Sequence, residues 1–131
     1  MAYYRDLREY LNALESGGKL TRISRPINKD TELYPLVRLQ YRGLSEVERT
    51  AYLFENVYGS RGDKYDMPVL VGALAGSTDI YSIGMQVPPE QIWLKLAEAE
   101  ANPIPPSIVE QAPVQEVVYR GAELEASGGL A

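Results

Sequence analysis

The chain has 131 residues with no cysteine and no histidine, and its 13 basic and 18 acidic side chains give a net charge of −5. This length suits one domain, and a hydrophobic content of 45% argues against disorder. The acidic balance, the polar N-terminus and the lack of a long apolar run favour a cytoplasmic protein that binds neither nucleic acid nor membrane. Without imidazole or thiol, an enzyme complete in this chain would depend on carboxylates, Lys, Arg, Ser or Tyr.

The first two elements are predicted from a cap and from a β-rich stretch. Residues 6–16 have the spacing of an amphipathic helix, with Asp6 as its N-cap and two glycines after it. Residues 19–27 are expected to form a strand that bulges or ends near its proline. Arg22 and Arg25 in this strand are either solvated charges on a sheet edge or a contact to another domain or subunit.

The centre of the chain is a pair of apolar runs, which follow a second predicted helix at residues 32–42. The runs cover residues 51–54 and 67–75 and lack alternation, as expected for strands buried on both faces. The prediction therefore places five side chains in the core: Leu53, Phe54, Val69, Leu70 and Val71.

Two short motifs near these runs have a functional and a structural interpretation. Glu55 and Asn56 follow the first strand, where α/β proteins place chemistry, but Asn56 to Gly59 also has the composition of a simple turn. Residues 72–77, GALAGS, are glycine-rich before a predicted helix, as in a phosphate loop. They lack the lysine and the spacing of known phosphate-binding motifs, so nucleotide binding is the weaker interpretation.

The last third of the chain changes from helices to a linker. Helices are predicted at residues 77–85, capped by Ser77 or Thr78, and from Pro88 onward. Trp93 is expected to anchor the core from the second of these helices. Residues 102–113 are proline-rich and are expected to be a linker, while residues 114–119 alternate like a strand that has no partner in this chain.

These elements predict an α/β fold, with α+β as the alternative. A small buried sheet would be covered by amphipathic helices, followed by a proline-rich linker and a strand that lead towards a missing domain. The expected boundaries are residues 1–101 for the α/β domain and residues 102–131 for the connection.

Four stretches of the chain, in this order, resemble the N-terminal domain of the UbiD family of decarboxylases. They are DLREYLNALESGGKLTRISRPIN (6–28), LFENVYGS (53–60), DMPVLVGALAGS (66–77) and APVQEVVYRGAEL (112–124). The last stretch is similar to the segment that leads into the family's flavin-binding domain. The chain departs from the family at residues 72–77, where the usual pattern is GNLFGS and the asparagine is replaced by Ala73.

The resemblance implies the N-terminal part of a reversible decarboxylase of aromatic or α,β-unsaturated acids. Such enzymes use prenylated FMN, with its phosphate held through a divalent metal (manganese) and potassium, and the full-length enzyme is expected to be a homo-oligomer. Their catalytic and metal-binding residues belong to the next domain. No catalytic, cofactor-binding or metal-binding residue is therefore assigned to this chain, and no cofactor is expected in it.

The expected role of this chain is a structural contact with the flavin-binding domain. The alternative is a free-standing interaction domain or small subunit that docks onto a separate catalytic chain. A complete small hydrolase is poorly supported because no nucleophile and base pair is visible. The residues predicted to form the interdomain contact are Phe54, Glu55, Asn56, Gly59, Val117 and Tyr119.

Overall fold

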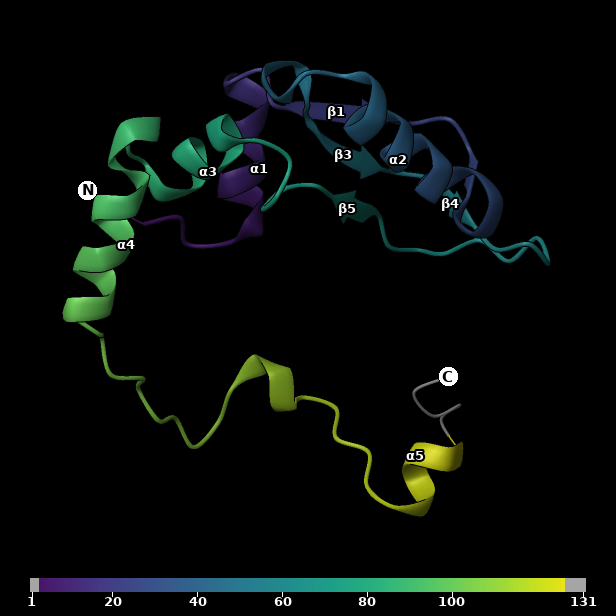
Figure 1. The fold of residues 1–131 in the computed structure, drawn as a ribbon. Coiled ribbons are helices and arrows are strands. Elements are labelled where there is room, and N and C mark those ends of the chain that lie inside the picture. The colour runs from purple at the N-terminus through teal and green to yellow at the C-terminus, as the bar shows by residue number, and fades with distance from the viewer. Residues whose placement is uncertain (1–2, 127–131) are drawn as a thin grey trace. The chain divides into compact units, whose positions relative to one another are not determined.

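The computed structural model describes residues 3–126, and the chain divides into two compact units, Met1–Ala101 and Asn102–Ala131. In chain order, the helices and strands of the first unit are α1 (Leu7–Ser16), β1 (Leu20–Ile23), β2 (Ile27–Asn28), α2 (Tyr34–Gly43), β3 (Ala51–Phe54), β4 (Val57–Tyr58), β5 (Val69–Val71), α3 (Thr78–Met85) and α4 (Ile92–Ala101) (Figure 1). A π-helical turn (Lys29–Leu33) precedes α2, and short 3-10 turns lie at Glu46–Glu48 and Pro89–Gln91.

The sheet is built around β3. Strand β1 runs parallel to β3 on one side, with Leu20 opposite Ala51, and β5 runs antiparallel on the other, with Leu70 opposite Leu53. A second pair, β2 and β4, is also parallel. Parallel neighbours need a long crossover connection, which the π-helical turn and α2 supply here. The mixture of helices and small sheets confirms the predicted α/β class.

The core consists of two apolar clusters that share β3. The first contains Leu14 of α1 and Ala51 at the start of β3. The second contains Ile27 of β2 and Phe54 at the end of β3. Of the five predicted core side chains, Leu53 and Phe54 are buried, and the three of β5 are half-buried because β5 lies at the edge of the sheet.

Local sequence signals placed the helix ends correctly. The carboxylate of Asp6 caps α1 by accepting a hydrogen bond from the amide of Glu9 (2.9 Å), as predicted. Gly18 follows the helix with φ +67°, a conformation that glycine adopts without steric cost. The predicted first strand is shorter than expected: β1 ends at Ile23, and after Pro26 the chain forms β2, which pairs with β4 in the second sheet.

The prediction for Trp93 is wrong. Its side chain is 80% exposed, whereas the neighbouring Ile92 is 8% exposed and is the residue of α4 that enters the domain. A helix turns by about 100° per residue, so successive apolar residues point in different directions and cannot all face the same side.

The predicted strand at residues 114–119 is also wrong. In the second unit the structure has a 3-10 turn at Pro113–Gln115 and a short helix, α5 (Ala122–Ala126), with no strand in the described residues of that unit. Alternating apolar residues form a stable strand only when a neighbouring strand and an apolar surface are available.

Candidate functional site

The residues predicted to contact another domain begin at the end of β3. Phe54 is fully buried in the second cluster, so its side chain serves the core. The carboxylate of Glu55 accepts a hydrogen bond from Arg22 (3.1 Å), which also donates to both oxygens of Glu15 (2.8 and 3.0 Å). The hydrogen bonds from this guanidinium lower the pKa of the Glu15 carboxyl group. Arg22 therefore ties the sheet to α1 within the domain.

Asn56 holds together the connections between the two small sheets. Its side-chain amide donates to the carbonyl of Ser24 (2.6 Å), and its own carbonyl accepts from the amide of Ile27 (2.9 Å). Ser24 lies between β1 and β2, and Ile27 is the first residue of β2. These contacts favour the structural interpretation of the Glu55-Asn56 pair as a turn that positions β4 beside β2.

Gly59 starts a charged loop that is fastened to the π-helical turn. Its amide donates to the carbonyl of Asp63 (2.8 Å) within the loop. The next residue, Ser60, donates to the carboxylate of Asp30 through its amide (3.0 Å) and its hydroxyl (2.7 Å). Lys29 (2.6 Å) and the two Ser60 donors lower the pKa of the Asp30 carboxyl group to about 2. One carboxylate thus joins the loop to the π-helical turn.

The glycine-rich segment at residues 72–77 forms a tight loop between β5 and α3. The amide of Gly76 donates to the carbonyl of Gly72 (3.0 Å), and Gly72 has φ +79°. A Cβ on Gly76 would come within 2.6 Å of that carbonyl oxygen, so glycine is required there. Leu74 at the tip is 72% exposed.

Two tyrosine hydroxyls donate hydrogen bonds to carbonyl groups of this loop. Tyr10 of α1 donates to the carbonyl of Ala73 (2.6 Å), and Tyr41 of α2 donates to that of Ala75 (3.4 Å). Burial raises the pKa of the Tyr10 hydroxyl. The loop therefore depends on helices that lie far from it in the sequence.

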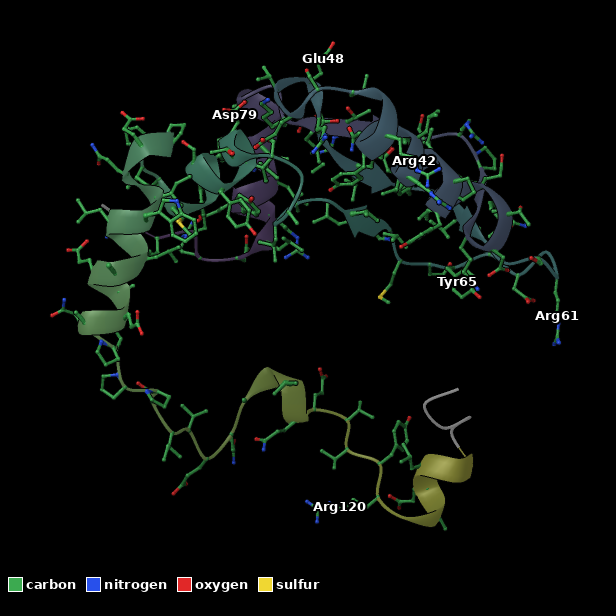
Figure 2. All side chains as sticks on the ribbon, viewed as in Figure 1. Arg42, Glu48, Arg61, Tyr65, Asp79 and Arg120 are labelled. Carbon is green, nitrogen blue, oxygen red and sulfur yellow. The ribbon has the colours of Figure 1, made fainter. Side chains whose placement is uncertain are left out.

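The N-terminus of α3 is already capped by acidic and hydroxyl groups. Ser77 accepts a hydrogen bond from a first-turn amide (3.3 Å), and the carboxylate of Glu46 accepts from the amide of Thr78 (2.6 Å) and from its hydroxyl. Asp79, which lies in the same first turn of α3 (Figure 2), forms an ion pair with Lys19 (2.7 Å). Two carboxylates thus lie where a phosphate would bind, which argues against the nucleotide-loop interpretation.

A shallow apolar cleft of about 490 Å³ lies beside the loop. It separates α1 from the edge strand β5, and its lining is almost entirely hydrocarbon. The lining residues are Leu7, Tyr10, Tyr41, Leu70, Val71, Gly72, Ala73, Leu74 and Ala75.

The two predicted contact residues of the second unit are exposed. Val117 is 63% exposed and Tyr119 is 55% exposed, and both lie in irregular chain before α5. The interdomain contact itself stays a prediction for all six residues. The side chains of Glu55, Val117 and Tyr119 are at least partly accessible to a partner, whereas the side chain of Phe54 is buried.

Residues 3–126 contain no group of three or more Asp, Glu, His or Cys side chains that could hold a metal ion. In that same part of the chain, no helix has the length and apolar character needed to cross a membrane. The contacts described above are structural, and the conspicuous surface features are an apolar cleft and exposed apolar side chains.

The fold is that of a small α/β domain whose conspicuous surfaces are apolar. Residues 11–100 match the family of 3-octaprenyl-4-hydroxybenzoate carboxy-lyase N-terminal domains. The chain belongs to this UbiD N-terminal domain family, as the resemblance in its sequence predicted.

Two solved structures of the UbiD-class enzyme HmfF from Pelotomaculum thermopropionicum are similar to the chain. One, in complex with FMN, is 34% identical with a TM-score of 0.64, over 85% of this chain and 23% of the HmfF chain. The other, an evolved dimeric form in complex with prFMN, is 34% identical with a TM-score of 0.61, over 78% of this chain and 21% of the other. The chain therefore corresponds to less than a quarter of the enzymes that it matches.

Proposed function

We propose that the chain is the N-terminal domain of a UbiD-class decarboxylase and that its role is structural. The full-length enzyme would carry out reversible non-oxidative carboxylation and decarboxylation of aromatic or α,β-unsaturated acids. The observation that carries this proposal is the family match over residues 11–100 together with HmfF structures in complex with prFMN and FMN.

The described residues of this chain do not fit a flavin phosphate or its metal. The glycine-rich loop leads into a helix N-terminus that Glu46 and Ser77 already cap. The chain has no histidine, and residues 3–126 hold no cluster of potential metal ligands. Prenylated FMN, the divalent metal and potassium would therefore bind to the rest of the enzyme, and this domain would cover that part and exclude water from it.

The test is a titration of the purified chain with prenylated FMN, manganese and potassium. Binding is followed by flavin fluorescence, and turnover by carbon dioxide release from a panel of aromatic acids. We expect neither binding nor turnover, whereas a complete UbiD-class enzyme run in parallel should show both. Stoichiometric flavin binding with turnover by this chain alone would contradict the proposal.

A further inference from the structure

Helix α2 has an exposed side that carries arginine, tyrosine and leucine but no acidic residue. Its buried side is formed by Val37 and Gln40. With a turn of about 100° per residue, the exposed side chains of the helix gather on the opposite side. They form the basic face of α2, which consists of Tyr34, Pro35, Arg38, Leu39 and Arg42 (Arg42 is labelled in Figure 2). This face concentrates positive charge in a chain whose net charge is −5.

The two arginines of the basic face have no carboxylate partner, unlike the cations that come before them in the chain. Every lysine and arginine that precedes α2 forms an ion pair within the domain: Arg5, Arg8, Lys19, Arg22, Arg25 and Lys29. Among residues 3–126, the side chains of Arg38 and Arg42 form no ion pair and no hydrogen bond. Arg42 lies in the last turn, where the helix dipole favours a cation, but Arg38 lies in the middle of the helix and gains nothing from it. Both guanidinium groups are therefore available to a partner.

The chemistry of the basic face points to a partner that carries carboxylates. Residues four positions apart are neighbours on a helix surface, so Arg38 and Arg42 present two adjacent positive charges. A guanidinium group matches a carboxylate in a bidentate pair. Tyrosine and arginine are also the side chains that are enriched at the centres of protein interfaces, and Tyr34, four positions before Arg38, is 72% exposed. The partner that fits is an acidic protein surface that accepts a tyrosine ring.

Two other occupants fit this face less well. A second copy of the chain would form a twofold contact in which the face lies against itself, so Arg38 and Arg42 of both copies would repel one another. The phosphates of a nucleic acid also match guanidinium groups, but a chain with a net charge of −5 repels such a polyanion at long range. The basic face therefore selects an acidic protein surface.

We propose that the basic face of α2 docks onto an acidic surface on the remaining part of its own UbiD-class enzyme. The matched HmfF chains are more than four times as long as the part that this chain covers, so most of such an enzyme lies outside this domain and is available as the partner. This inference rests on the proposed function, because it takes the rest of that enzyme as the partner.

The first experiment compares the exposure of Tyr34 in the 131-residue chain and in the full-length enzyme. Hydroxyl-radical footprinting, read by mass spectrometry, measures the oxidation rate of this side chain in each protein. We expect the rate to fall several-fold in the enzyme, because docking removes the tyrosine ring from solvent. A rate that is the same in both proteins overturns the inference.

The second experiment tests the charge of the partner in the full-length enzyme. Arg38→Glu combined with Arg42→Glu places carboxylates where the guanidinium groups were. Arg61→Glu combined with Lys64→Glu is the matched control, because it makes the same change of charge at exposed positions of the loop after β4. We expect the oxidation rate of Tyr34 to return to that of the isolated chain in the first variant and to stay low in the control. Continued protection of Tyr34 in the first variant would mean that the partner is not acidic, and it overturns the inference.

The same double variants are made in the isolated chain to separate docking from folding. The basic face has no partner there, so reversal of its charge should leave the thermal midpoint close to that of the unchanged chain. If the reversed chain does not fold, Arg38→Gln with Arg42→Gln replaces it, since these changes remove the charges without adding repulsion. Loss of Tyr34 protection in the enzyme then reports on docking alone.

The outcomes separate this inference from the proposed function. Equal oxidation of Tyr34 in the isolated chain and in an active enzyme would show that the domain joins the enzyme through another face, which overturns the docking site and leaves the proposed function standing. An oxidation rate that falls with the concentration of the isolated chain would overturn it in favour of a second copy. Exposure of Tyr34 in the control variant would overturn it in favour of an effect of total charge. Flavin binding by the isolated chain would instead contradict the proposed function.

Discussion

At the scale of single residues, two tyrosines show how hydroxyl groups can fix a loop from a distance. Tyr10 is 9% exposed, and its hydroxyl lies 2.6 Å from the carbonyl oxygen of Ala73. The same hydroxyl lies 3.3 Å from the carbonyl oxygen of Ile80 in α3. One hydroxyl of α1 thus links the glycine-rich loop to α3, with its single proton directed mainly to the carbonyl of Ala73.

Tyr10→Phe removes this donor without changing the packing of the ring. We expect the free energy of unfolding to fall by about 1–3 kcal/mol, because a buried carbonyl loses its partner. The measurement is a urea denaturation curve. Tyr34→Phe is the matched control, since Tyr34 is 72% exposed and should change the midpoint little. Equal effects of the two substitutions would contradict the role assigned to the Tyr10 hydroxyl.

At the scale of elements, one ionised group joins the charged loop after β4 to the π-helical turn. Asp30 is exposed, but its carboxyl pKa of about 2 lies below the value of about 3.9 expected in an unfolded chain. A group with a lowered folded-state pKa stabilises the fold above its unfolded pKa, and this contribution is lost as pH falls through the folded value. The contribution of this carboxylate to the attachment of the loop should therefore be complete at pH 5 and about half lost near pH 2.

We expect the amide resonance of Ser60 to titrate with a midpoint near pH 2, because its donor is bound to the Asp30 carboxylate. Asp30→Asn should abolish this titration and speed amide hydrogen exchange at Ser60 at neutral pH. Asp63→Asn changes a carboxylate on the same loop that does not bind Ser60, and should leave the titration in place. A Ser60 midpoint near 4 in the unchanged protein would contradict the contact.

The elements also show which features a sequence can predict. The caps at Asp6 and Ser77 were predicted because cap, helix start and partner amide lie within four residues of one another. Trp93 was wrongly predicted to be buried. Helix α4 has apolar residues on two sides, so the spacing of those residues does not indicate which side faces the domain. Glu46 was missed as a cap of α3 because it lies 32 residues from Thr78 and no local pattern marks such a contact.

At the scale of the whole molecule, the two core clusters both take residues from the three strands β1, β3 and β5. Ile80 is fully buried in the first cluster, and Ile27 is 1% exposed in the second. The two residues share no cluster, so each can be changed without altering the surroundings of the other. The unit nevertheless should unfold in one step, because both clusters include residues of the same central strand.

Ile80→Val and Ile27→Val should each lower the free energy of unfolding by about 0.5–1.5 kcal/mol, the usual effect of removing one buried methylene. The double variant should show the sum of the two losses within about 0.5 kcal/mol, as for sites without shared partners. Chemical denaturation of the four proteins measures this. A larger departure from the sum would mean that the clusters are coupled through the sheet that they share.

The contact between Tyr10 and Ala73 also sets an order of events during synthesis. The two residues are 63 positions apart, so the ribosome needs roughly 3 to 13 seconds to deliver the partner at about 5–20 residues per second. A helix as short as α1 is marginal by itself in water, so it gains lasting structure only when the glycine-rich loop has emerged. Helix α1, although it is made before the loop, is therefore stabilised only after the loop has emerged, and nascent chains that stall before residue 73 should leave it open to proteases.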